Sequence, residues 1–159
     1  RFNEVQTDEQ IDVIMPVLIE RDPRLADLVA AMDTDTKSFQ KIIETVFNYW
    51  VSPECEIGGI QSWSDYSGGV ISAFEGAVAS AQPGTDTAIF TSGGTIATMV
   101  GHVLKLTSNR VYEFYEPVFN CSITRIIFNS RKCSLSTFND VEHLHLMSAQ
   151  LRERLVTYR

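Results

Sequence analysis

The chain has 159 residues, of which 44% are hydrophobic and 21% charged, values that fit one globular domain and exclude a disordered chain. Thirteen Lys and Arg against twenty Asp and Glu give a formal net charge of -7, which argues against a nucleic-acid-binding protein. The three cysteines form no CxxC motif, and no apolar run reaches the roughly 18 residues of a membrane span. We therefore expect a cytoplasmic protein without disulfides, nucleic-acid partners or membrane attachment.

The first third of the chain predicts three helices. The first begins at a capping box that Thr7 opens, and Pro16 lies inside it, where a proline should kink or split a helix. A short helix is predicted from Leu25 to Met32 and the strongest one from Ser38 to Trp50. The apolar stripe of this last helix contains Phe39, Ile42, Ile43, Val46, Phe47 and Trp50.

The middle of the chain predicts a loop, two helices and a strand between them. The loop runs from Glu54 to Gln61, and a helix follows from Ser62 to Ala81. Thr87 to Thr91 is a short run with an apolar centre, typical of a buried strand in a parallel sheet. A further helix is predicted from Gly94 to Leu106.

The C-terminal part predicts an antiparallel hairpin. After a short helix near Ser108 to Tyr115, strands are expected from Asn120 to Phe128 and from Cys133 to Phe138. A last helix from about Met147 places apolar residues at positions 147, 151 and 155 on one face. Helices that alternate with strands indicate an α/β domain with a mixed sheet. Three strands are few for such a sheet, so further strands are expected outside these residues.

The most informative stretch is the turn Ser92-Gly93-Gly94-Thr95, between the predicted strand and the following helix. Ligands of open α/β sheets bind beyond the carboxyl ends of the strands, and the N–H groups at a helix N-terminus attract anions. Gly93 and Gly94 allow a ligand to approach the backbone closely. A phosphate site and a plain helix cap with a tight turn are both compatible with this pattern.

Other motifs are absent or incomplete. No lysine follows the two glycines as in a P-loop, and no G-x-G-x-x-G is present. A serine hydrolase would need Ser92, Asp140 and His143, but Phe90 replaces the first glycine of the nucleophile elbow. A metal pair of His143 and His145 lacks a third ligand in the sequence, so no cofactor or metal is expected.

Three segments together resemble the histidine phosphatase superfamily, also called the phosphoglycerate mutase-like family. They are "IFTSGGTIATMVGHVLKL", "NCSITRIIF" and "STFNDVEHL", in the family's order and spacing over roughly residues 2–145. The resemblance implies a three-layer sandwich, in which helices flank a mostly parallel mixed sheet. It also implies that residues 1–159 are the C-terminal part of a single domain, with a helical insert over residues 5–60 and the first βα units missing.

In this family a histidine of an Arg-His-Gly motif on the first strand becomes phosphorylated, as a neutral imidazole is a good nucleophile near pH 7. By resemblance, Glu4 is the candidate general acid, and Ser92 replaces the family's second phosphate-binding histidine. Ser92, Gly93 and Gly94 would then bind the phosphoryl group. No Arg-His-Gly occurs among the 159 residues, so the nucleophile is expected upstream of Arg1.

Two functions follow from the resemblance. The first is a phosphomonoester phosphatase or phosphoglycerate mutase-like enzyme, whose partner is a small phosphorylated substrate and whose nucleophile lies upstream. The second is a non-catalytic protein of the same fold, because Ser92 cannot carry the positive charge of a histidine. A homodimer is compatible with either function, and the chain by itself is expected to be inactive.

Overall fold

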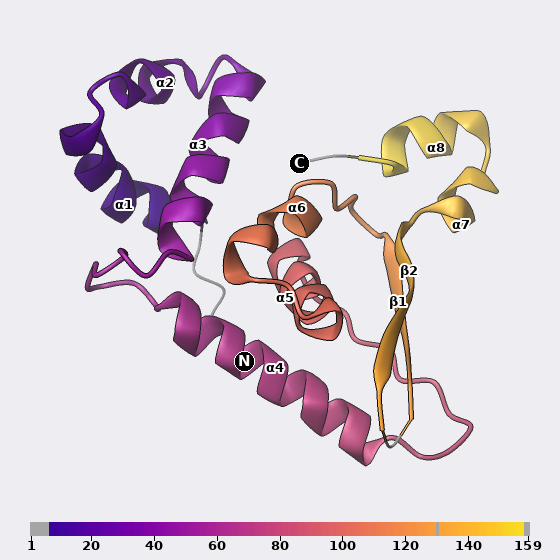
Figure 1. Cartoon of the computed structure of the whole chain (residues 1–159). Coiled ribbons are helices and arrows are strands. Elements are labelled where there is room, and N and C mark those ends of the chain that lie inside the picture. Colours follow the sequence, from indigo (N-terminus) through magenta and orange to yellow (C-terminus); the bar gives the residue numbers. More distant parts are fainter. Residues whose placement is uncertain (1–6, 130, 158–159) are drawn as a thin grey trace. The chain divides into compact units, whose positions relative to one another are not determined.

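The structure, a computed structural model, describes residues 7–129 and 131–157 (Figure 1). The chain divides into two compact units, residues 1–69 and residues 70–159. The boundary lies inside helix α4 (Trp63–Ser80), so that the first residues of this helix belong to unit 1 and the rest to unit 2. The assignment of residues 1–159 to a single domain stays a prediction.

Unit 1 is helical. It contains α1 (Thr7–Arg21), α2 (Leu25–Ala31) and α3 (Thr36–Trp50), and each of the three contacts the other two. The core side chains of α1 recur at helical spacing and are Ile11, Ile14, Met15 and Leu18. Pro16 was predicted to kink or split this helix; the split was wrong, because α1 runs through Pro16 without a break. Pro16 lies on the exposed side of α1, where water can bond the Asp12 carbonyl that a proline leaves free.

Helix α3 has the predicted buried stripe and a cap that the sequence analysis missed. Ile42, Val46, Phe47 and Trp50 are buried, whereas Phe39 and Ile43 are half-buried. Asp35 at the N-cap accepts hydrogen bonds from the backbone N–H groups of Lys37 and Ser38, at 3.3 and 2.9 Å. These bonds satisfy two of the donors that a helix N-terminus leaves unpaired.

An aromatic cluster joins the end of α3 to the start of α4 within unit 1. The Trp50 ring lies edge-on to Trp63, with the ring centroids 5.2 Å apart, and 5.3 Å from the ring of Tyr66. Trp50 Nε1 donates a 2.8 Å hydrogen bond to the Gln61 carbonyl oxygen. The buried indole is therefore satisfied, and it fixes the loop between the two helices.

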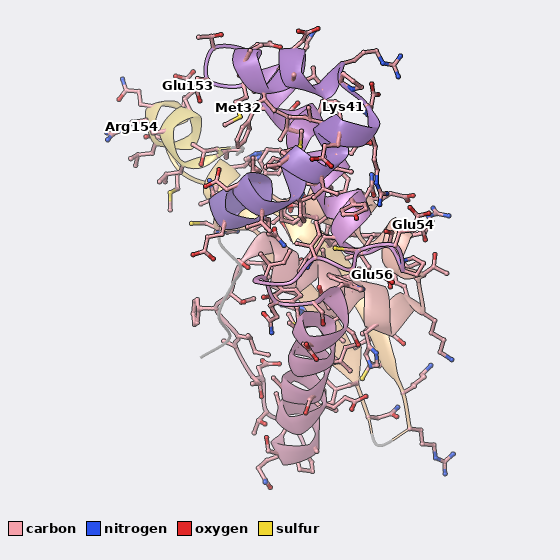
Figure 2. All side chains as sticks on the ribbon, turned by 90° about the vertical axis from the view of Figure 1, so that its left-hand side faces the viewer. Met32, Lys41, Glu54, Glu56, Glu153 and Arg154 are labelled. Carbon is pink, nitrogen blue, oxygen red and sulfur yellow. The ribbon has the colours of Figure 1, made fainter. Side chains whose placement is uncertain are left out.

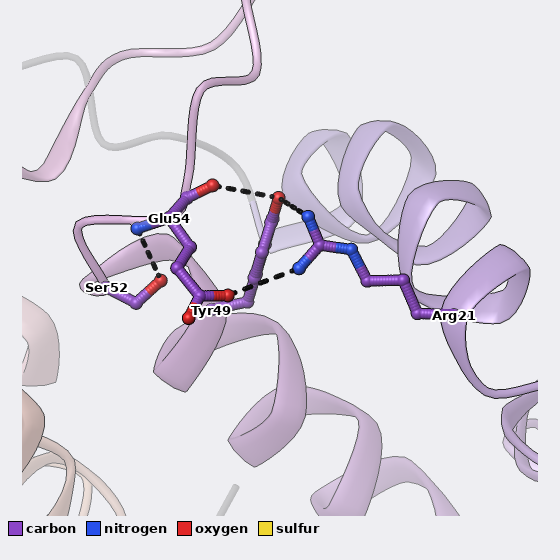
Figure 3. A network of polar contacts seen from close by, with 4 residues as sticks. All are labelled: Arg21, Tyr49, Ser52 and Glu54. Carbon is purple, nitrogen blue, oxygen red and sulfur yellow. Dashed lines mark hydrogen bonds and ion pairs between the residues drawn. The ribbon is translucent and has the colours of Figure 1, made fainter.

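A polar network holds the end of α1 against the end of α3 (Figure 3). The Arg21 guanidinium donates to Tyr49 Oη at 3.4 Å and to Glu54 Oε2 at 3.3 Å. Tyr49 Oη in turn donates to the Glu54 carbonyl oxygen at 3.2 Å. Arg21 also lies 5.1 Å from the centroid of the Tyr49 ring, a cation–π distance. The network satisfies the polar end of the buried Tyr49.

Unit 2 is built around α5 (Gly93–Leu104). A 3₁₀ turn (Ser108–Arg110) and α6 (Tyr112–Tyr115) follow it, and α5 contacts α6. At Gly101 an added Cβ would lie 3.0 Å from Val111 Cγ2, so this glycine permits Val111 to pack closely against α5. The predicted helices over these residues are confirmed.

The sheet of unit 2 has two antiparallel strands, β1 (Ile123–Phe128) and β2 (Cys133–Asp140), as the hairpin pattern predicted. The register shifts between Ile123 and Arg125, next to Asn139 on β2, which has a φ of 58°. Short helices α7 (Glu142–His145) and α8 (Ala149–Leu155) complete the chain. Leu144 of α7 is buried, whereas Leu146, Met147, Leu151 and Leu155 are exposed, Leu146 at 90%.

The predicted strand over Thr87–Thr91 was wrong. The residues between α4 and α5 form neither a helix nor a strand, and Phe90 is 97% exposed. A strand requires a neighbour to bond its backbone, and in the part of the chain that the structure describes the sheet consists of β1 and β2 alone. The mostly parallel three-layer sandwich is therefore not confirmed.

Within the described residues, no helix combines the length and apolar character of a membrane span.

Candidate functional site

The turn that the sequence analysis singled out forms the start of α5. Ser92 is extended, with φ -88° and ψ 169°, and Gly93 begins the helix. Gly93 is buried and Gly94 is half-buried. An extended residue followed directly by a helix aims the first backbone N–H groups of the helix along the incoming chain, which is the geometry that binds anions at helix N-termini.

Ser92 occupies the N-cap of α5 without acting as a cap. Its side chain makes no capping hydrogen bond, whereas the corresponding Asp35 carboxylate of α3 accepts two. The purely structural interpretation of the turn, in which a hydroxyl caps the helix, therefore fails at Ser92. Ser92 is half-buried as a residue, and capping does not occupy its hydroxyl.

The buried face of α5 holds this corner in place. Ala97 and Val100 are completely buried, and Thr98 Oγ1 donates a 2.8 Å hydrogen bond to the Gly94 carbonyl oxygen. At the other end the helix stops at Lys105, where Leu106 N donates to the Gly101 carbonyl oxygen at 2.9 Å. A rigid helix of this kind positions its N-terminal turn well.

The charge of the chain is distributed unevenly between the units. Residues 70–159 contain eight Lys and Arg and seven Asp and Glu, a net charge of +1 (8 − 7). Residues 1–69 contain five and thirteen, a net charge of -8 (5 − 13). The negative charge of the protein thus belongs to unit 1, and the unit that contains the Ser92 corner does not repel an anion by its net charge.

Glu4, the candidate general acid, lies outside the described residues. The structure therefore brings together Ser92, Gly93 and Gly94, and it leaves the position of Glu4 relative to them untested.

The serine hydrolase alternative is not supported. Asp140 Oδ1 accepts a 2.7 Å hydrogen bond from Glu142 N, at the start of α7. His143 Nδ1 is buried and has no hydrogen-bond partner among the residues that the structure describes, so none of their carboxylates orients this imidazole as a triad requires.

The positions and contacts of the histidines fit structural roles. His143 and His145 lie two positions apart on α7, a spacing that does not place them on one helix face. His102 Nε2 lies 3.4 Å from Glu75 Oε1, and its ring is edge-on to Phe74, so both the polar and the aromatic part of this side chain have partners on α4. Among the described residues, no three His, Cys, Asp or Glu side chains could hold a metal ion together.

Asn139 is a position that sequence reasoning missed. Its Oδ1 accepts a 2.9 Å hydrogen bond from Phe119 N, and its Nδ2 donates at 2.6 Å to the Pro117 carbonyl oxygen. The side chain therefore ties the segment that leads into β1 to the end of β2. The available signal was the Asn-Asp pair of "STFNDVEHL", since asparagine tolerates a positive φ better than most residues.

Comparisons with known proteins place the chain in a family. No curated protein and no solved structure matches it. A family model for the histidine phosphatase superfamily (branch 1) matches residues 5–141, which include α1 to α6, the Ser92 corner and the hairpin. The match covers most of the chain and confirms the resemblance to the superfamily. The chain therefore belongs to the histidine phosphatase superfamily (branch 1), whose fold is of the α/β class.

Proposed function

We propose that this protein takes part in phosphoryl transfer, as a phosphomonoester phosphatase or a phosphoglycerate mutase-like enzyme, and that the start of α5 binds the phosphoryl group of a small substrate. The observation that carries the proposal is the uncapped corner, with an extended Ser92 whose side chain makes no capping bond and a buried Gly93. Backbone N–H groups of Gly93 and Gly94 would approach the phosphoryl oxygens, and the Ser92 hydroxyl would donate to one of them. Family membership supports this class of activity.

The chemistry would run through a phosphohistidine. A histidine attacks the phosphorus, the P–O bond to the leaving alcohol breaks, and an acid protonates the leaving oxygen; water then releases phosphate from the histidine. Glu4 is the proposed acid. None of the three histidines, His102, His143 and His145, lies in an Arg-His-Gly sequence, so the nucleophile would come from a segment outside these 159 residues.

The same proposal accounts for the uncovered apolar residues before the corner. Ile89 is 50% exposed and Phe90 97% exposed, in a stretch whose composition is typical of a central strand. Neighbouring strands of a mostly parallel sheet, supplied by the segment with the nucleophile, would bond this stretch and bury both side chains. The Ser92 corner would then lie at the carboxyl end of a strand.

A second candidate is a non-catalytic protein that binds small phosphorylated compounds. The observation that favours it is Ser92 itself, because a hydroxyl carries no positive charge for the transferring group. A charged hydrogen bond contributes about 1–2 kcal/mol more than a neutral one. This loss would lower the rate of phosphoryl transfer more than the binding of phosphate.

Hydrolysis of para-nitrophenyl phosphate by the complete natural protein tests the proposal. We expect turnover by the parent protein, a several-fold lower kcat for Ser92→Ala and a higher kcat for Ser92→His. Ser80→Ala is the matched control, since it removes an exposed hydroxyl at the end of α4. If neither the parent nor Ser92→His turns over while an Arg-His-Gly histidine is present, the enzyme proposal fails and the binding function remains.

The 159-residue chain alone should show no phosphatase activity, because it contains no candidate phosphohistidine in the family's motif. Phosphorylation of a histidine on this chain after incubation with a phosphomonoester would contradict that expectation.

A further inference from the structure

The boundary along the chain between the two compact units lies within α4, directly after a pair of glycines. The boundary falls between Gly69 and Val70, and α4 is one continuous helix across it. Glycine weakens a helix interior because it loses the most backbone entropy on folding. Two of the three glycines of α4 are therefore adjacent to the point where the contacts of one unit give way to those of the other, and the third, Gly76, lies inside unit 2.

Each half of α4 is anchored in a different unit. Before the pair, Trp63 and Tyr66 pack on Trp50 of α3, with ring centroids 5.2 and 5.3 Å away. After the pair, Phe74 is buried and its ring lies 6.2 Å from that of His102 on α5. The Glu75 carboxylate reaches the same histidine. A bend between the two anchors would leave both sets of contacts intact.

Packing does not explain the first glycine of the pair. Gly68 is exposed, and an added Cβ there would meet nothing within 4 Å. At Gly101, by contrast, an added Cβ would meet Val111, so that glycine has a steric reason. An exposed helical position with open space around it would ordinarily hold a residue with a higher helix propensity.

We propose that the Gly68–Gly69 pair is a hinge in α4. Its transient bending opens the backbone hydrogen bonds that span the pair, while the contacts of each half of α4 stay in place. Hinges of this kind are a few residues that absorb a change of φ and ψ between rigid bodies.

Hydrogen exchange of the α4 amides tests the hinge. A helix without a hinge exchanges fastest at its ends and slowest in its middle. We expect the amides of residues 69–73 to exchange faster than those of residues 74–78. Gly68→Ala should slow the exchange of residues 69–73 about fivefold, the factor that corresponds to the propensity difference between glycine and alanine.

Gly76→Ala is the matched control. It makes the same substitution in the same helix, at another exposed position with nothing within 4 Å, but inside unit 2. This variant should leave the exchange of residues 69–73 unchanged. The hinge is refuted if these amides are the slowest in α4, if Gly68→Ala does not slow them, or if Gly76→Ala slows them equally.

A distance measurement separates bending from local unfolding. Nitroxide labels at the exposed Cys121 and at Lys41→Cys, in a Cys55→Ser/Cys133→Ser background, would lie on the two sides of the glycine pair in the sequence and report bending at it. Lys41 projects from α3 (Figure 2). Pulsed electron paramagnetic resonance should give a broad distance distribution that Gly68→Ala narrows. An equally broad distribution in both proteins would overturn the hinge.

Discussion

Asn139 Nδ2 donates a 2.6 Å hydrogen bond to the carbonyl oxygen of Pro117, across 22 positions of the sequence. The backbone of Asn139 has a φ of 58°, a conformation in which most side chains are strained. Asn139 thus has a backbone conformation that few other residue types adopt, and its side chain makes hydrogen bonds to both Phe119 and Pro117.

Replacing Asn139 should therefore reveal two separate costs. Asn139→Ala loses both side-chain hydrogen bonds and keeps the strained φ, and we expect it to lower the free energy of unfolding by about 2–4 kcal/mol. Asn139→Gly loses the same bonds without the strain and should be about 1 kcal/mol more stable than Asn139→Ala. Urea denaturation measures both. Equal stabilities of the two variants would show that the φ at this position carries no strain.

Gly101 should not tolerate a methyl group. The added Cβ of Gly101→Ala would lie 3.0 Å from Val111 Cγ2, tighter than an ordinary contact, so we expect a loss of about 1–3 kcal/mol from overpacking. Gly76→Ala gains helix propensity in open space and should stabilise by about 0.5–1 kcal/mol. Thermal unfolding compares the two. If both substitutions stabilise the protein, α5 and α6 do not pack as closely as described.

Lys105 should be more stable as glycine. It ends α5 in the left-handed conformation, with a φ of 57°, where glycine is the preferred residue. We expect Lys105→Gly to raise the free energy of unfolding by about 1 kcal/mol, measured by urea denaturation. Lys37→Gly, at an exposed position in the first turn of α3, is the control and should destabilise. A loss of stability for Lys105→Gly would contradict the left-handed conformation of Lys105 at the end of α5.

Asp35 should make the stability of α3 depend on pH. The Ser38 hydroxyl and the backbone N–H groups of Ser38 and Lys37 bond this carboxylate and lower its pKa below the ordinary value of 3.8. A carboxylate with a lowered pKa in the folded state contributes stability that is complete above the unfolded pKa and is lost as the pH falls through the folded one. Titration of the Asp35 carbon resonance should give a midpoint below 3.8.

Asp35→Asn removes the charge but keeps an acceptor, so the variant should lack this acid-dependent part of the stability. Asp22, whose pKa is also lowered, through hydrogen bonds from Arg24, should keep its lowered pKa in the Asp35→Asn variant. If the stability of Asp35→Asn falls at low pH as much as that of the parent protein, the cap does not favour the carboxylate form of Asp35.

Local sequence patterns predicted the helices well. The 3.6-residue spacing in α1, α3 and α5 depends on residues close in sequence and on one buried face each. Ile14, Ile42 and Val100 are completely buried, as their patterns predicted. The hairpin was predictable for the same reason, because Asn129 lies in a short turn between two β-prone runs.

The failures have a common physical cause, in that they depend on partners that local sequence does not reveal. Ile89 and Phe90 have the composition of a buried strand, but strand formation needs a second backbone, and in the described residues Phe90 is almost fully exposed. Met147, Leu151 and Leu155 share the expected spacing and are nevertheless exposed. At the site, a hydroxyl at an N-cap predicts capping by default, and only the geometry shows that Ser92 does not cap α5.

The central claim is that the start of α5 binds a phosphoryl group, and it is tested most directly by a nuclear magnetic resonance titration of the complete natural protein with inorganic phosphate. The account predicts saturable shifts of the Gly93 and Gly94 amide resonances, and weaker binding in Ser92→Ala but not in the control Ser80→Ala. Saturable binding that leaves the Gly93 and Gly94 amides unmoved, or no binding at all, would contradict it.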